Sequence, residues 1–160
     1  MLRIRFLRPP GALPEAQFLA RCLHCGQCAQ TCPFDCIKLR TGWNFFTGGA
    51  GTPQIYPDAA PCVLCLHCTT VCPSGAIEPV TLEEAKMGQS RLDRQVCFTW
   101  TRTLLCRTCF ERCPKKGRAI VLTDGIYPNI TNECAGCGTC EHVCPAKAIV
   151  TIPNGFDEPA

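Results

Sequence analysis

Cysteine carries the chemistry of this sequence. Seventeen of the 160 residues are cysteines, and most of them fall into short repeated runs. Three runs have four cysteines followed by proline: "CLHCGQCAQTCP", "CVLCLHCTTVCP" and "CAGCGTCEHVCP". Their cysteines are Cys22, Cys25, Cys28 and Cys32; Cys62, Cys65, Cys68 and Cys72; and Cys134, Cys137, Cys140 and Cys144. Such dense cysteine favours metal ligation, and the odd total argues against a fully paired disulfide framework.

The spacing within each run indicates which metal centre is bound. Cys-x2-Cys-x2-Cys-x3-Cys-Pro is the run with which bacterial ferredoxins hold 4Fe–4S clusters. One loop places three thiolates on three corners of a cubane, and the fourth cysteine reaches a neighbouring cluster. Motifs therefore work in pairs. Gly26, Gly136 and Gly138 would let backbone N–H groups approach the sulfur atoms. Zinc and thioredoxin-like sites use a lone Cys-x2-Cys, so three complete runs favour clusters.

A further copy, "VCFTWTRTLLCRTCFERCP", has its first cysteine displaced. Cys106, Cys109 and Cys113 are close together, and Cys97 lies nine residues before Cys106. Because a longer loop between two ligands costs little closure entropy, we predict that Cys97 is the first ligand. The alternative is an ordinary buried thiol at Cys97, with a three-iron cluster or none. With Cys97 included, sixteen cysteines serve four 4Fe–4S clusters and only Cys36 is left over.

Side chains outside the runs have less specific interpretations. Cys36 is expected to pack beside a cluster as a small hydrophobe, with a ligand role as the alternative. The histidines are expected to be exposed loop residues, with donation to sulfur as the alternative. A basic cluster forms either a solvated turn or a dock for an acidic partner. The aromatic residues either anchor an interface or have a core or cluster-shielding role. These residues are His24, His67 and His142; Lys115, Lys116 and Arg118; and Trp43, Phe45, Phe46 and Trp100.

The elements that must position these loops are predicted to be short. A short helix is expected around each fourth cysteine, ended by the proline, and a short strand after it. "YPDAAPC" and "IYPNITNEC" predict strands that enter turns. Residues 40–54 predict a Gly-rich surface loop, and residues 80–95 a short surface helix. The Pro-rich ends predict extended arms lying on the domain or on a partner. The expected strand positions are Ile37, Ile77, residues 120–122 and residues 149–152.

Bulk composition limits the remaining function classes. The formal charge of +3 treats cysteines as neutral. Four oxidised clusters of about −2 each would bring it to about −5 (3 − 8), so the charge predicts no nucleic-acid partner. No apolar run reaches the length of a signal peptide or a membrane span, so we expect a soluble, cytoplasmic protein. A periplasmic location is the alternative if an export signal was omitted. Aromatic residues make up only 8%, which predicts a thin core unless a large non-protein group fills it.

Several segments resemble one known family. "RPPGA", "ARCLHCGQCAQTCPFD", "PCVLC", "VCPSGA", "EAKMG", "CFERCPKK" and "CAGCGTCEHVCP" are similar to segments of the four-cluster ferredoxin-type proteins of the NapG/MauM group. Those proteins serve periplasmic nitrate reduction and methylamine utilisation. The resemblance implies that motifs pair first with fourth and second with third, whereas composition alone also allows neighbours to pair. The implied ligand sets are Cys22, Cys25, Cys28 and Cys144; Cys134, Cys137, Cys140 and Cys32; Cys62, Cys65, Cys68 and Cys113; and Cys97, Cys106, Cys109 and Cys72.

The expected fold follows from this pairing. It is an α+β, loop-rich fold with small antiparallel hairpins and two pseudo-symmetric 2×(4Fe–4S) ferredoxin units within a single domain over residues 1–160. One unit combines motifs 22–32 and 134–144, and the other combines motifs 62–72 and 97–113.

The resemblance also sets the expected function. A twin-arginine export signal, carried by NapG-type proteins, is absent here, and their second motif is wider. The short form also resembles the electron-transfer subunit of bacterial tungsten aldehyde oxidoreductase. We therefore expect an iron–sulfur electron-transfer subunit that is not catalytic alone. It would wire a tungsten or molybdenum catalytic subunit to a flavin/NAD subunit, and it could stack on itself into a filament. The alternative is a maturation or quinol-linked ferredoxin-type protein of the NapG/MauM kind.

Overall fold

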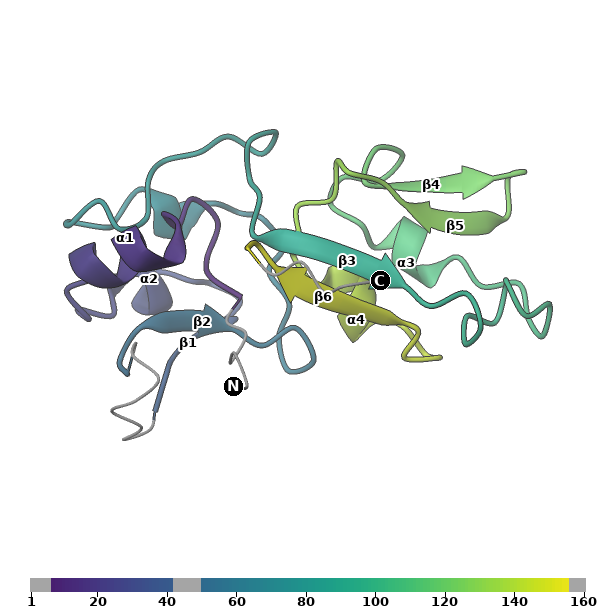
Figure 1. Cartoon of the computed structure of the whole chain (residues 1–160), viewed down its shortest axis with the longest axis horizontal. Helices are drawn as coiled ribbons and strands as arrows, with labels where there is room; N and C mark the ends of the chain where they lie inside the picture. The colour runs from purple at the N-terminus through teal and green to yellow at the C-terminus, as the bar shows by residue number, and fades with distance from the viewer. Residues whose placement is uncertain (1–6, 42–49, 156–160) are drawn as a thin grey trace.

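The computed structural model describes residues 7–41 and 50–155, and it has two lobes that lie side by side (Figure 1). Residues 7–41 and 50–85 form the N-lobe, and residues 86–155 form the C-lobe. The strands belong to three two-stranded antiparallel sheets, and the helices are short. In the described segments no helix has the length and apolar character needed to cross a membrane. Trp43, Phe45 and Phe46 lie outside the described residues, as does most of the expected 40–54 loop.

The N-lobe is built around one hairpin. Strands β1 (Ile37–Leu39) and β2 (Pro53–Ile55) pair antiparallel, with Ile37 opposite Ile55. The helical elements are α1 (Glu15–Arg21), α2 (Gln27–Gln30) and the 3-10 helix η1 (His67–Thr69). The strand expected at Ile77 is reduced to a single bridge with Ala12. The strand before the second run is β2, so it ends before the predicted "YPDAAPC" segment begins.

The "RPPGA" segment is part of this lobe. Arg8 is buried and donates to both carboxylate oxygens of Glu15 and to the hydroxyl of Thr52. Gly11 has a φ of +77°, and a Cβ there would lie 2.1 Å from the carbonyl oxygen of Glu78. Glycine is required because no side chain fits this approach. The N-terminal arm therefore lies on the domain, as one of the two predicted alternatives stated.

The C-lobe contains two antiparallel pairs. Strand β3 (Gly88–Leu92) pairs with β6 (Ile149–Pro153), and β4 (Ile120–Thr123) pairs with β5 (Tyr127–Ile130). The strands predicted at 120–122 and 149–152 are confirmed. The surface helix predicted within residues 80–95 is wrong, because β3 occupies most of that segment's second half. Its full ladder with β6 and the burial of Gly88 and Ser90 override the weak helical pattern.

The remaining helices, α3 (Thr108–Glu111) and α4 (Thr139–His142), belong to the C-lobe. Together with α2 and η1 they share one placement, which differs from the prediction. Each contains the third regular cysteine of its run, and each ends before the fourth cysteine. The Cys-Pro pair explains the early end, because the residue before a proline is disfavoured in helical conformation. The cysteines inside these four elements are Cys28, Cys68, Cys109 and Cys140.

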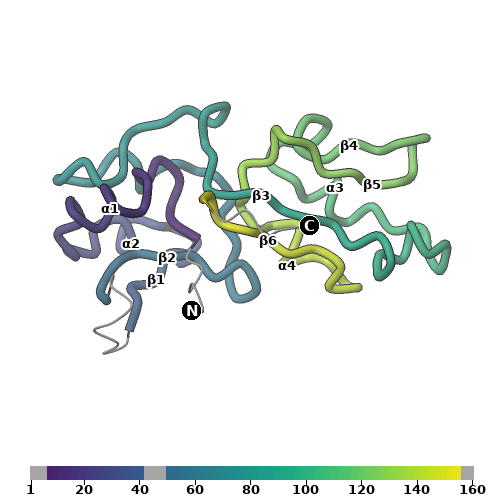
Figure 2. Tube along the Cα trace, viewed as in Figure 1, coloured from purple at the N-terminus to yellow at the C-terminus, as the bar shows by residue number. Residues whose placement is uncertain are grey.

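Figure 2 shows the two lobes side by side along the trace. Cysteine loops of the two lobes contact each other. The N–H of Cys62 donates to the carbonyl of Cys137 over 3.0 Å, and the Thr139 hydroxyl donates to the carbonyl of Cys62 over 3.2 Å. A Cβ on Gly138 would lie 2.4 Å from the Cβ of Pro57. The second and fourth motifs therefore pack directly against each other.

Candidate iron–sulfur centres

Seventeen cysteines line four separate hollows; Cys36 is a fifth cysteine in one of them, and the other sixteen fall into four sets of four. We name each hollow by the motif that contributes most of its cysteines. Hollow A is lined by Cys22, Cys25, Cys28 and Cys72; hollow B by Cys62, Cys65, Cys68 and Cys32; hollow C by Cys97, Cys106, Cys109 and Cys144; and hollow D by Cys134, Cys137, Cys140 and Cys113. In each hollow three cysteines come from one motif and the fourth comes from another.

This grouping corrects the pairing that the resemblance implied. The first motif exchanges its fourth cysteine with the second, and the third motif exchanges with the last, so neighbours in sequence pair. Short-range contacts explain the arrangement. The β1–β2 hairpin and the hydrogen bond from the Leu13 N–H to the Ala76 carbonyl (3.1 Å) close the first two motifs on each other. Closing such short segments costs less chain entropy than pairing the ends of the chain. Each lobe therefore contains one pair of motifs, and the units predicted from motifs 22–32 with 134–144 and 62–72 with 97–113 are not formed.

The displaced cysteine of the third motif reaches its hollow. Cys97 is buried and lines hollow C with Cys106 and Cys109. The buried Thr99 closes the insertion, since its hydroxyl accepts from the Cys106 N–H (2.9 Å) and donates to the Cys106 carbonyl (2.8 Å). The Trp100 indole N–H donates to the Pro128 carbonyl over 3.0 Å. These bonds fold the insertion back onto the lobe, so its length does not separate Cys97 from the other cysteines.

The loops of the three complete runs share an unusual backbone. In each, the residues two and four positions after the first cysteine have positive φ. Leu64 and Leu66 adopt this conformation at +59° and +64°, although they have side chains. Successive N–H groups in such loops form concave cradles for anions. The six residues are His24 and Gly26, Leu64 and Leu66, and Gly136 and Gly138.

Several hydrogen-bond donors face the sulfur atoms. The N–H of Leu64 donates to Cys62 Sγ and that of Gly136 donates to Cys134 Sγ, both over 3.4 Å. The N–H of Ala148 donates to Cys144 Sγ over 3.3 Å. Such donors stabilise anionic sulfur, as an iron–sulfur cluster requires. In hollow A the N–H of Ile77 donates to Cys72 Sγ over 3.4 Å. The cysteines of each hollow and the N–H groups that face them therefore fit a 4Fe–4S cluster.

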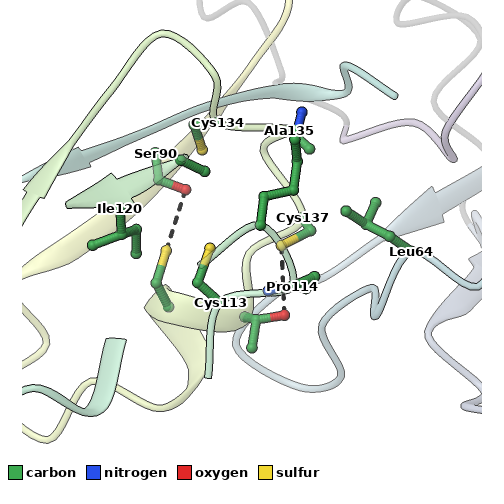
Figure 3. Close-up of a pocket in the computed structure, with 12 residues that line it drawn as sticks. Leu64, Ser90, Cys113, Pro114, Ile120, Cys134, Ala135 and Cys137 are labelled. Carbon is green, nitrogen blue, oxygen red and sulfur yellow. Dashed lines mark hydrogen bonds between the residues drawn. The ribbon is translucent and has the colours of Figure 1, made fainter. Parts of the chain in front are cut away.

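Hollow D shows the arrangement most clearly. Figure 3 shows the sulfur atoms of Cys113, Cys134 and Cys137 turned toward a common space lined by Ile120. The Ser90 hydroxyl lies 3.4 Å from Cys140 Sγ, and the Thr139 hydroxyl lies 3.5 Å from Cys137 Sγ. Sequence reasoning missed these hydroxyls. For Thr139 a Cys-x-[Ser/Thr] pattern was a usable signal, because Ser74 and Thr108 stand in the same relation to Cys72 and Cys106. Ser90 lies 50 residues from Cys140, so no local pattern marks it.

The four cysteines inside the short helices, Cys28, Cys68, Cys109 and Cys140, would be protonated thiols at neutral pH without iron. Burial raises the pKa of Cys28 and of Cys109 to about 11, and that of Cys68 and of Cys140 to about 12. Burial also acts on Cys72, but hydrogen bonds from Ser74 and Ile77 outweigh it and lower the pKa of that thiol. Only thiolates ligate iron, so binding must displace these protons. Within the described residues, no three His, Cys, Asp or Glu side chains could hold a single metal ion.

The hollows lie in a defined order through the molecule. Hollows A and B exchange cysteines within the N-lobe, and C and D exchange them within the C-lobe. Across the lobe interface, Leu64 of the second motif lines hollow D, and the Cys62 N–H bonds to the Cys137 carbonyl. The order is therefore A, B, D, C.

The other candidate residues follow the simpler interpretations. His24 and His67 are exposed, and His142 bonds the carbonyl of Asp58 over 3.0 Å. The predicted basic cluster is mostly engaged within the protein. Arg118 pairs with Glu83 (2.5 Å) and Glu133 (2.7 Å), Lys116 pairs with Glu111, and the buried Lys115 points to the Glu83 carbonyl. Trp100 packs within the C-lobe, 4.9 Å from Tyr127.

Comparison with known proteins agrees with this picture. A family model described as a 4Fe-4S dicluster domain matches residues 21–76, and one described as a 4Fe-4S binding domain matches residues 134–148. The dicluster match spans the first and second motifs together, as the N-lobe does.

Relatives match nearly the whole chain. The ferredoxin-type protein NapG of Escherichia coli K12 is 38% identical over 92% of this chain and 70% of its own length. The methylamine utilization ferredoxin-type protein MauM of Paracoccus denitrificans is 39% identical over 88% of this chain and 67% of its own length. NapG of Haemophilus influenzae is 36% identical over 92% of this chain and 58% of its own length.

The fold and the four cysteine hollows define a ferredoxin-type 4Fe–4S protein, whose function is electron transfer. More narrowly, the chain belongs to the family of ferredoxin-type proteins that includes NapG and MauM.

Proposed function

We propose that the chain is an electron relay of the NapG/MauM kind that holds four 4Fe–4S clusters, one in each of hollows A to D. The observation that carries the proposal is that sixteen cysteines divide into four sets of four, with no cysteine used twice. When bound, each cluster accepts and donates one electron. The ligands are the sixteen cysteines that line the hollows, including the displaced Cys97.

The order A, B, D, C makes hollows A and C the two ends of the relay. Both ends carry exposed apolar side chains beside a ligand. Leu23 at hollow A is 67% exposed, and in the insertion Leu104 and Leu105 are 60% and 74% exposed. Exposed leucines beside terminal centres support docking of a redox partner at each end. One partner would be a redox catalytic subunit, and the other a quinol- or flavin-linked protein.

The end at hollow C carries positive charge. Arg102 lies in the insertion, and Arg107 and Arg112 follow it in the third motif; all three are exposed. Of these, only Arg107 has an acidic neighbour among the described residues, Glu111 at 3.9 Å. Charge of one sign on the rim of an apolar patch steers a partner of opposite charge. We therefore propose that the partner at this end presents an acidic surface.

The names of the relatives favour the NapG/MauM kind of function over the tungsten aldehyde oxidoreductase partnership, which the sequence resemblance alone suggested. A stable subunit of a relay would co-purify with its partner, whereas a maturation factor would leave its client after acting.

Anaerobic native purification tests this proposal. Iron and acid-labile sulfide should each be close to sixteen per chain, and a bound redox subunit should be identifiable. Twelve irons, or a three-iron EPR signal in the intact protein, would contradict four clusters. Tungsten or molybdenum in the complex would identify the catalytic partner, and cell fractionation would separate a cytoplasmic from a periplasmic location. Sizing under several conditions tests stacking into a filament, which a discrete small species would exclude.

A further inference from the structure

Hollow B contains a fifth cysteine that the ligand sets do not use. Cys36 is buried and lines hollow B together with Cys32 and Cys62. Its sulfur lies 3.4 Å from Cys32 Sγ, at hydrogen-bond distance for two sulfur atoms. The thiol is therefore in contact with one of the four proposed ligands of this hollow.

The four repeats show that this thiol is an addition to a common plan. Each Cys-Pro is followed, a few residues later, by a small buried residue and then a buried isoleucine. In the other three repeats the small residue is alanine, exposed by 1 to 3% of its surface, and Cys36 is exposed by 3%. The equivalent pairs are Cys36–Ile37, Ala76–Ile77, Ala119–Ile120 and Ala148–Ile149. Alanine satisfies the packing at this position, so packing does not require a thiol.

We propose that Cys36 is a positioning residue that donates an S–H hydrogen bond to a ligand sulfur of hollow B and so raises the reduction potential of that centre above its value without the thiol. This inference rests on the proposed function, in which Cys32 ligates iron. A ligating Cys32 has lost its proton, so the proton between the two sulfur atoms belongs to Cys36. Cys62 is also a hydrogen-bond neighbour of Cys36 and belongs to hollow B, so the same centre is affected whichever sulfur accepts.

The direction of the effect follows from charge. Reduction adds one negative charge to the centre and its thiolates, and a donor to sulfur stabilises the more negative state. Hollow B lies next to the lobe interface, in the interior of the A, B, D, C order. A raised potential there would favour residence of an electron in the middle of the relay rather than at its exposed ends.

EPR-monitored redox titration of the full, cluster-loaded chain tests the proposal. Cys36→Ala should make reduction of one centre about two- to tenfold less favourable, which is the range for loss of one hydrogen bond, and leave the others unchanged. Cys36→Ser, which keeps a donor, should restore most of the difference. A variant that joins Cys36→Ala to Ala76→Cys should lower the potential of the hollow B centre and raise that of hollow A.

The outcomes separate this inference from the proposed function. Full iron content with unchanged midpoints in Cys36→Ala would overturn the inference and leave the relay intact. Loss of about four irons in Cys36→Ala would also overturn it, because Cys36 would then be a ligand. Wild-type protein with fewer than four clusters would instead contradict the proposed function.

Discussion

The two lobes use the same cysteine chemistry with different amounts of supporting structure. The N-lobe has two regular motifs, and its described residues contain only a hairpin of three residue pairs and two isolated bridges. The C-lobe has the irregular third motif but longer ladders of five and four residue pairs. The irregular loop is thus found where the sheets are more extensive. An insertion between two ligands is therefore compatible with a complete set of cysteines when the surrounding strands keep the other cysteines in place.

The lobes also differ in charge. Residues 7–85 contain four basic and six acidic residues, a net of −2, and residues 86–155 contain ten basic and five acidic residues, a net of +5. Much of the excess lies along the third motif. The irregular motif, residues 97–113, contributes three arginines against one glutamate, a net of +2, which supports its proposed role as a partner-binding end.

The largest expected effect is the unfolding of both lobes when iron is removed. Ten of the 25 buried apolar residues described are cysteines, and Phe18 is the only aromatic residue among them. A core built this way has little apolar contact without its clusters, so chelation should unfold the whole chain. Circular dichroism recorded alongside iron content checks this. A folded C-lobe in iron-free protein would show that its longer sheets are enough to keep it folded without clusters.

Double substitutions test which motifs share a cluster. Cys97→Ala and Cys144→Ala together should remove one cluster, about four irons, because both cysteines line hollow C. Cys22→Ala with Cys144→Ala should remove two clusters, about eight irons, because these cysteines line different hollows. The first-with-fourth pairing implied by the resemblance predicts the reverse, so iron analysis of the two variants decides between the groupings.

Substitution at the lobe interface should have a smaller effect. Gly138→Ala would place a Cβ 2.4 Å from Pro57 at a φ of +80°. Overpacking and left-handed backbone strain together should lower the free energy of unfolding by roughly 2–5 kcal/mol. Gly125→Ala is the matched control, since φ is +72° there but nothing lies within 4 Å, so about 1–2 kcal/mol is expected. The midpoint temperature for loss of visible cluster absorbance should fall more for Gly138→Ala. Equal shifts would mean that the lobes are not tightly packed at this point.

The smallest effect concerns the charged end. Exchange of Arg102, Arg107 and Arg112 for glutamate should slow electron transfer to a carboxylate-terminated electrode by about tenfold at low ionic strength. The loss should fade as salt screens the charges. Arg21→Glu with Lys38→Glu in the N-lobe is the control and should change this rate little. A similar loss in both variants would assign the effect to net charge rather than to the insertion.

Local patterns in the sequence predicted most of the site's components. The spacing of the cysteines predicted clusters, and the position of Cys97 before a regular remainder predicted a stretched motif whose cysteines would still meet. The structure brings Cys97, Cys106 and Cys109 together. Such predictions succeed because ligands on one loop are close whatever the rest of the chain does. The helix predicted within residues 80–95 failed because a strand partner some 60 residues away, Ile149–Pro153, determined the conformation there.

The sequence by itself determined the metal chemistry and the protein family, because both depend on residue types at short spacing. Only the tertiary structure decided which fourth cysteine completes which hollow, that hollows B and D meet at the lobe interface, and that Cys36 lies against Cys32. Those relations depend on contacts between segments that are separated in the chain, and spacing along one loop carries no information about them.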